Sequence, residues 1–255
     1  MEVVKWLINC NYRKNRTSKI KYIVVHYTAG LSSKSNNAIN TVKNTFNIKG
    51  KNASAHYVVD DYNIIQCVED YDTAYHCGTT GTYKHKECRN ANSIGIEICS
   101  NYKGGIPSGK TYNDLKATDP NWYFTEKSLK NAEELIAELC KKYNIPMVNV
   151  IRHYDVTGKT CPAPFVNGNG FNDWLRFKKN ILNIIEKGEK EVGGIIYNKI
   201  EELPEWAKNE VKFFIDNGYL NGIGCNLLLS EDMVRLLVIL YRVLHKGGWL
   251  LWRIF

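Results

Sequence analysis

Apolar stretches in the first two thirds of the chain predict buried strands. The segment Lys21–Tyr27 (KYIVVHY) is β-branched and aromatic, which is typical of a largely buried strand. Ser93–Cys99 (SIGIEIC) alternates instead, so one face carries three isoleucines and the other carries Gly95, Glu97 and Cys99. A carboxylate therefore shares its face with two small residues. Further strands are expected at His56–Asp60, Ile64–Cys67 and Met147–His153, the first two as a hairpin.

A helical period of apolar residues appears between and after these strands. The clearest helix runs from Thr125 to Tyr143, with Thr125 as its N-cap and Pro146 just beyond its end. A second amphipathic helix is predicted at Asn172–Glu186, and a shorter one carries Ile39, Val42 and Phe46. Because strands and helices alternate, the predicted fold class is α/β, with a mixed central β-sheet flanked by helices.

The periodic pattern stops at Lys187–Gly194 (KGEKEVGG), a charged segment that contains glycine. We therefore predict a large first domain at residues 1–187, a linker at 188–194 and a small helical module at 195–255. In that module, Pro204–Asn217 predicts one helix, and Ser230–Asp232 offers the N-cap and acidic first turn of another. The last segment, Lys246–Phe255 (KGGWLLWRIF), is apolar enough that we expect it to be buried at an interface or against the module.

Composition excludes several classes of protein. With 255 residues, 44% hydrophobic and 24% charged, the chain is neither collagenous nor disordered, and no apolar run approaches the ~20 residues of a membrane-spanning helix. Eight cysteines occur without a C-x-x-C pair, which excludes a zinc ribbon and a thioredoxin-type motif. The net charge of +8 favours polyanionic partners such as teichoic acids, nucleic acid or acidic lipid, and does not distinguish among them. The first residues lack a signal-peptide pattern, so we expect synthesis in the cytoplasm.

Three residues in apolar or glycine-rich surroundings form a candidate metal-ligand set. His26 and His153 each end a predicted strand, and Cys161 follows eight residues after His153 in RHYDVTGKTCPAP. Two imidazoles and a thiolate leave one position of a tetrahedral zinc ion open, as a catalytic site requires. The alternative is two hydrogen-bonded histidines and a buried thiol without a metal, and spacing alone leaves both open.

Four sequence blocks, in order, carry a family resemblance: VVHYTA, SAHYVVD, NSIGIEI and RHYDVTGKTCP. Over roughly residues 20 to 185 the chain resembles the N-acetylmuramoyl-L-alanine amidases, a zinc-dependent family shared by phage endolysins, bacterial autolysins and peptidoglycan recognition proteins. The resemblance implies an endolysin that hydrolyses the amide bond between N-acetylmuramic acid and L-alanine in peptidoglycan. It also implies action at the bacterial cell wall after release from the cytoplasm.

The same resemblance assigns roles to individual residues. It makes His26, His153 and Cys161 the ligands of Zn²⁺. It makes Glu97 the general base and later proton donor, and Lys159 the residue that stabilises the oxyanion. The alternatives are a surface carboxylate on an edge strand for Glu97 and a solvated loop lysine for Lys159. His76, in AYHCG, matches a histidine that lines the substrate groove, so a substrate-binding role is expected; the equal alternative is a histidine of the core or of a hairpin end. Many relatives have a tyrosine where this chain has Ala55, and that departure shifts the expected catalytic role to Glu97.

The segment Ile200–Arg242 distantly resembles a single S-layer homology unit. Such units are associated with secondary cell-wall polymer and usually occur in threes, so a single unit implies weak binding or a site formed between chains, as in a homodimer. A helical hairpin packed on the catalytic domain is the alternative. For the whole chain, a non-catalytic peptidoglycan receptor and a host-encoded autolysin are the competing functions. No basic stripe with interleaved aromatic residues is present, so nucleic acid is not an expected partner.

Overall fold

The computed structural model describes residues 2–29, 34, 36–111, 114–192, 196–220 and 226–246. The chain divides into two compact units, residues 1–185 and 186–255. Among the helices of these described ranges, none combines the length and the apolar character that a membrane span requires.

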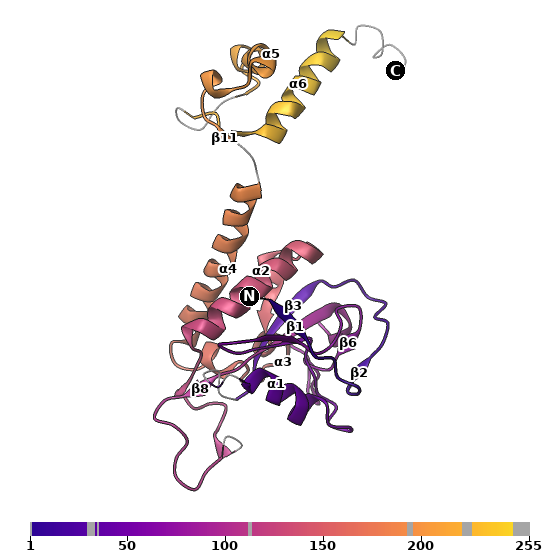
Figure 1. The fold of residues 1–255 in the computed structure, drawn as a ribbon, viewed down its shortest axis with the longest axis vertical. Coiled ribbons are helices and arrows are strands. Elements are labelled where there is room, and N and C mark those ends of the chain that lie inside the picture. Colours follow the sequence, from indigo (N-terminus) through magenta and orange to yellow (C-terminus); the bar gives the residue numbers. More distant parts are fainter. Residues whose placement is uncertain are drawn as a thin grey trace. The chain divides into compact units, whose positions relative to one another are not determined.

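A six-stranded mixed sheet forms the centre of the first unit (Figure 1). Its order is β1 (Val3–Lys5), β5 (Ile64–Gln66), β4 (Tyr57–Val59), β7 (Ser93–Ile98), β3 (Tyr22–Tyr27) and β10 (Val150–Arg152). Strands β4 and β5 form the predicted antiparallel hairpin, whereas β4, β7, β3 and β10 are parallel neighbours. Two short pairs lie outside this sheet: β2 (Tyr12–Arg13) with β6 (Thr73–Ala74), and β8 (Asn101–Tyr102) with β9 (Trp122–Tyr123).

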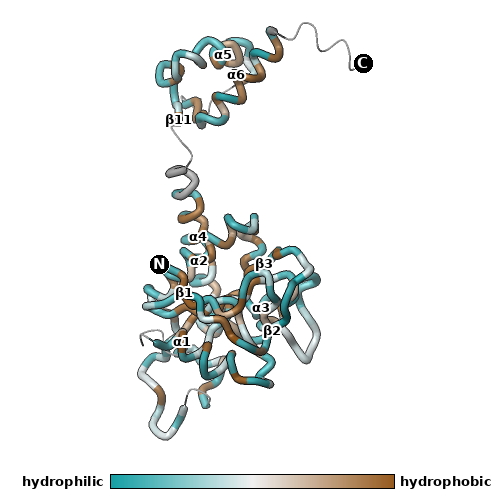
Figure 2. Tube along the Cα trace, turned by 45° about the vertical axis from the view of Figure 1, so that its right-hand side comes forward, coloured by the Kyte–Doolittle hydropathy of each residue, from teal (hydrophilic) through white to brown (hydrophobic). Residues whose placement is uncertain are grey.

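Helices cover both faces of the sheet, as the α/β prediction requires. The isoleucines of β7 pack in one core with α2 (Glu126–Tyr143) and the first part of α4 (Gly170–Val192). On the other face, α1 (Asn37–Thr41) and the π-helix Val42–Phe46 pack against Val58 and Ile65. Figure 1 shows α1 and α2 on opposite sides of the sheet, and Figure 2 shows hydrophobic residues along the central strands. Gly95 and Glu97 therefore face away from the α2 core, as the alternation predicts.

Helix α2 begins and ends at the predicted signals. The Thr125 hydroxyl accepts a hydrogen bond from the Ser128 backbone N–H at 3.2 Å, which satisfies one of the free donors of the first turn. Asn144 ends the helix in the left-handed conformation, with φ of 53°. The expected N-cap at Thr125 is thus confirmed.

Three other elements differ from expectation. Only Val150–Arg152 of the predicted strand Met147–His153 is a strand, because Met147–Asn149 forms a 3-10 turn closed by the Asn149 N–H on the Pro146 carbonyl (2.8 Å). His153 begins helix α3 (His153–Thr157), since the Asp155 carboxylate accepts the Arg152 N–H at 2.9 Å and caps that helix. The helix predicted around Ile39 becomes a π-helix after Thr41. Helix α4 continues to Val192, beyond Glu186, because lysine and glutamate favour helix even without an apolar period.

The second unit is built on two helices and a two-stranded sheet. Helix α5 (Glu205–Asp216) follows Pro204, and α6 (Glu231–Lys246) follows Ser230, both close to prediction. Strands β11 (Ile196–Tyr197) and β12 (Leu229–Ser230) pair antiparallel, and a 3-10 turn spans Ile200–Glu202. Buried apolar side chains join these elements in a separate core: Tyr197, Leu203, Ala207, Val211, Leu229, Val234 and Val238. The predicted burial of the final segment concerns residues 247–255, which lie outside the described ranges.

Candidate active site

Parallel strands bring two predicted site residues side by side. In the register of β3 and β7, His26 pairs with Glu97, so the two side chains lie on the same face of the sheet. On the other side of β3, Arg152 of β10 pairs with Val25, and His153 follows at the same edge. Because the carboxyl ends of these strands meet at one edge, residues more than 120 positions apart become neighbours.

His26, His153 and Cys161 form a compact cluster at that edge. One ligand atom from each lies within 4.8 Å of the others, and His26 Nδ1 is 3.7 Å from Cys161 Sγ. All three side chains are buried. The loop that carries Cys161 is tied to α3, since the Cys161 carbonyl accepts the Tyr154 N–H at 2.7 Å. His153 Nε2 is buried without a hydrogen-bond partner among the described residues.

Burial keeps the two imidazoles of the cluster in the neutral form that a metal ligand requires. Burial lowers the pKa of His26 well below its ordinary value, with the neighbouring His153 adding to the effect, and lowers the pKa of His153 to about 4. Both imidazoles are therefore neutral near pH 7 and can offer a lone pair. Burial and the nearby Glu97 charge raise the pKa of Cys161 to about 12. Near pH 7 the thiol therefore keeps its proton until a metal cation displaces that proton. The cluster could hold a metal ion.

Glu97 and Lys159 line the same cavity as this cluster. That cavity has a volume of about 280 Å³ and also contacts Tyr27. Glu97 Oε2 is buried and has no hydrogen-bond partner among the described residues, although the side chain as a whole is partly exposed. Burial raises the pKa of Glu97 to about 8, against the opposing charge of Lys159. Lys159 is exposed and reaches the cavity from the loop before Cys161.

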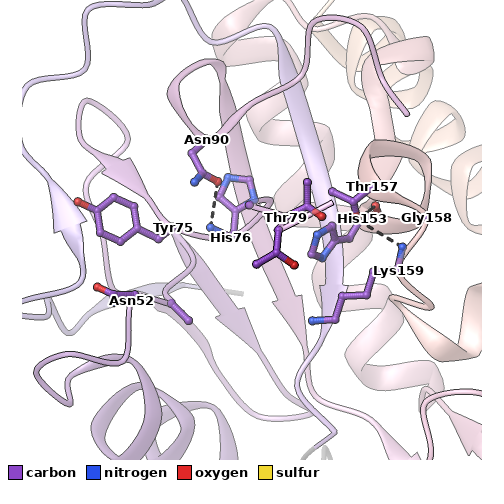
Figure 3. Close-up of a pocket in the computed structure, with 12 residues that line it drawn as sticks. Asn52, Tyr75, His76, Thr79, Asn90, His153, Thr157, Gly158 and Lys159 are labelled. Carbon is purple, nitrogen blue, oxygen red and sulfur yellow. Dashed lines mark hydrogen bonds between the residues drawn. The ribbon is translucent and has the colours of Figure 1, made fainter. Parts of the chain in front are cut away.

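A larger cavity of about 750 Å³ adjoins the cluster (Figure 3). His76, His153 and Lys159 line both cavities. Figure 3 shows His153 and Lys159 on one side, with Tyr75 and Asn52 on the other. His76 is 8% exposed and its Nδ1 lies 3.1 Å from His26 Nε2, so it contacts a candidate ligand as well as the cavity wall.

Sequence reasoning missed the residues that surround His76. Ser93 Oγ lies 3.1 Å from His76 Nε2, and the Asn90 side-chain oxygen accepts the backbone N–H groups of His76 (3.1 Å) and Cys77 (2.8 Å). The alternation of β7 offered a signal for Ser93, because it places this hydroxyl on the same face as Gly95 and Glu97. No comparable local pattern marks Asn90.

Comparison with known proteins finds relatives for this unit. The sequence profile of the family described as N-acetylmuramoyl-L-alanine amidase matches residues 16–164. A probable N-acetylmuramoyl-L-alanine amidase from Bacillus licheniformis is 30% identical over 185 residues, which are 69% of this chain and 45% of that protein. The amidase CwlL, also from Bacillus licheniformis, is 31% identical over 199 residues, 75% of this chain and 49% of that protein. The chain thus spans about half the length of the curated relatives it matches.

Solved structures agree with this relationship. A mutant endolysin from Bacillus subtilis matches with a TM-score of 0.52 and 27% identity, covering 71% of this chain and 99% of that one. The structure of PlyL matches with a TM-score of 0.50 and 28% identity, covering 71% of this chain and 97% of that one. The family profile covers more than half of the sequence, and the fold agrees, so this chain belongs to the N-acetylmuramoyl-L-alanine amidase family.

Proposed function

We propose that this chain is a zinc-dependent peptidoglycan amidase. It would hydrolyse the bond between the lactyl group of N-acetylmuramic acid and L-alanine, at the bacterial cell wall. The observation that carries the proposal is the convergence of His26, His153 and Cys161 beside Glu97. Family membership supports the reaction class, and the likeness to a Bacillus subtilis endolysin supports release from a producing cell onto the wall.

The donor set suits zinc. Two imidazole nitrogens and one thiolate match the ligand types that Zn²⁺ prefers, and three protein ligands are typical of catalytic rather than structural zinc sites. The buried, unpartnered Nε2 of His153 is a polar atom that a bound cation would satisfy. When bound there, zinc supplies a Lewis acid that acidifies water and polarises an amide carbonyl.

Glu97 is suited to move the proton of the reaction. Its Oε2 atom is buried in the cavity, and a pKa near 8 allows the carboxyl group both to accept and to return a proton near neutral pH. The carboxylate takes a proton from the attacking water as oxygen bonds to the lactyl carbonyl carbon. It then delivers that proton to the amide nitrogen as the C–N bond breaks. The products are a lactyl carboxylate and a peptide with a free L-alanine amino terminus.

Lys159 provides positive charge beside the reacting carbonyl. Its side chain lines both cavities, and its charge acts on His26, His153, Glu97 and Cys161. An exposed ammonium group between the two cavities can move to contact the bound substrate and stabilise the negative charge that develops on the carbonyl oxygen.

Purified peptidoglycan tests the proposal. We expect the chain to release new amino groups that label as L-alanine, without new reducing sugars. Cys161→Ser and His153→Ala should lose both zinc and activity. Glu97→Gln keeps the size of the side chain and should keep zinc, yet lose activity by about 10²–10⁴-fold. Reducing-sugar release without new amino groups would replace the amidase proposal with a glycosidase.

We also propose that the second unit binds a secondary cell-wall polymer. Its separate core supports an independent module, and the side chains of Trp206 (43% exposed) and Tyr219 (72% exposed) offer aromatic surface to a sugar polymer. Sedimentation with purified walls, before and after removal of that polymer, tests this role. Retention that is equal on both wall preparations would contradict it.

A further inference from the structure

A chain of hydrogen bonds leads from His26 away from the candidate metal cluster. His26 Nε2 lies 3.1 Å from His76 Nδ1, and His76 Nε2 lies 3.1 Å from Ser93 Oγ. Ser93 Oγ in turn donates to the Arg89 carbonyl oxygen at 2.7 Å. His26, His76 and Ser93 are all buried, so water does not compete for these contacts.

The Arg89 carbonyl, the last group in this series of hydrogen bonds, sets the direction of each of them. A carbonyl oxygen only accepts, so the Ser93 hydroxyl proton points to Arg89, and a lone pair of Ser93 Oγ is left for the His76 Nε2–H group. A neutral imidazole has one N–H, so His76 Nδ1 is bare and accepts the Nε2–H of His26. His26 Nδ1 is then bare as well, and this is the atom that lies 3.7 Å from Cys161 Sγ.

The surrounding backbone leaves space for the His76 ring and restricts its movement. A Cβ atom at Gly95 would lie only 2.4 Å from His76 Cγ, so the ring occupies space that any other residue on β7 would fill. The Asn90 side chain accepts the backbone N–H of His76, as Figure 3 shows, and also that of Cys77. The ring therefore has little freedom to turn toward a substrate in the larger cavity.

We propose that His76 is a positioning residue that, with Ser93 and the Arg89 carbonyl, holds His26 in the Nε2–H tautomer and directs Nδ1 to the metal. This inference rests on the proposed zinc site. Hydrogen-bond partners of ligating histidines fix the tautomer and the ring orientation, and their loss weakens metal binding. The role differs from the substrate contact that the resemblance implies for His76, because it acts through His26.

A matched pair of variants separates the two roles. Asparagine and leucine have similar shapes, but only His76→Asn keeps an acceptor near the position of Nδ1. We expect His76→Leu in the 255-residue chain to bind Zn²⁺ about 10–100-fold more weakly in competition with a chromogenic chelator. His76→Asn should stay close to wild type. Equal zinc affinity for both variants and wild type, with a raised KM on peptidoglycan, would overturn the proposal in favour of substrate contact.

A second measurement needs no substitution. Ring-nitrogen NMR of the zinc-loaded 255-residue chain should show His76 protonated at Nε2 with a bare Nδ1. A His76 protonated at Nδ1 would overturn the proposal even if the variants failed to fold. These readouts are independent of amide hydrolysis. A chain that binds zinc through this arrangement but releases no L-alanine amino termini would refute the proposed function and leave the positioning role intact.

Discussion

Gly95→Ala should disturb the candidate metal site without touching any proposed ligand. The added Cβ would lie 2.4 Å from His76 Cγ, 2.7 Å from Nδ1 and 2.8 Å from Cδ2. Non-bonded carbon atoms prefer separations of about 3.5–4.0 Å, so the ring must move by about 1 Å. Gly95 lies on the central strand β7 between β3 and β4, where the backbone has little room to yield.

The expected magnitude follows from two contributions. Overpacking of a buried site costs about 1–3 kcal/mol. Weakening the His76 hydrogen bonds to His26 and Ser93 removes about 0.5–1.5 kcal/mol each. We expect a total of about 3 kcal/mol in the free energy of unfolding, which corresponds to a Tm lower by about 6–12 °C for a unit of this size. Zinc affinity should fall by about 10–100-fold, because His26 loses its hydrogen-bond partner.

Calorimetry and chelator competition on the 255-residue chain measure both effects. Gly78→Ala is the control, since Gly78 lines the larger cavity with His76 but a Cβ there meets no atom within 4 Å, and its backbone is outside the left-handed region. It should change stability by less than about 0.5 kcal/mol. In a His76→Ala background, where the clashing ring is absent, Gly95→Ala should cost much less. Equal costs in both backgrounds would refute the steric explanation.

Two further predictions concern stability. Burial alone would raise the pKa of Asp70, but hydrogen bonds from Tyr143, Lys142 and Tyr57 outweigh it and hold the pKa below its ordinary value. The stabilisation is therefore present above the unfolded pKa of about 3.9 and is lost as the pH falls through the folded value. Asp70→Asn should cost about 1–3 kcal/mol at pH 7 in urea unfolding, and the difference from wild type should shrink below pH 4; a constant difference would contradict this. Chelation of zinc should lower the Tm of the first unit by removing a ligand that binds only the folded state, an effect worth about 2.7 kcal/mol when free zinc is 100 times its Kd. An equal Tm with and without chelator, in a preparation that binds zinc, would contradict a cluster that forms only on folding.

Local sequence patterns correctly predicted the strand face and the helix start that depend on adjacent residues. The alternation of Ser93–Cys99 and the N-cap at Thr125 are confirmed because a strand face and a helix start depend on adjacent residues. The strand at Met147–His153 was too long, because an apolar run does not reveal the Asp155 cap that starts α3 at His153. The end of α4 was placed too early because Lys and Glu sustain a helix after its apolar face has ended.

The site depends on contacts that no local pattern contains. Family resemblance pointed to His26, His153 and Cys161, but periodicity alone left a metal-free trio open. The pairing of β7 with β3 places Glu97 beside His26, and the pairing of β10 with β3 brings His153 to the same edge. These paired segments lie about 70 and 125 residues apart along the chain. The roles of these residues, of Lys159 and of His76 remain predictions for the experiments above.

Strand β7 contributes one face to the α2–α4 core and the other to the candidate active site. Its outward positions Ser93, Gly95 and Glu97 recur every second residue, so they meet Tyr22, Val24 and His26 in register on β3. Ser93 accepts from His76, Gly95 leaves room for that ring, and Glu97 presents its carboxyl group to the cavity. The inward isoleucines hold the strand in a core shared with α2 and α4, so a slip of one residue would take all three of them out of that core and remove all three site positions together. Register in this strand is therefore under two independent constraints, and this register places Glu97 beside His26.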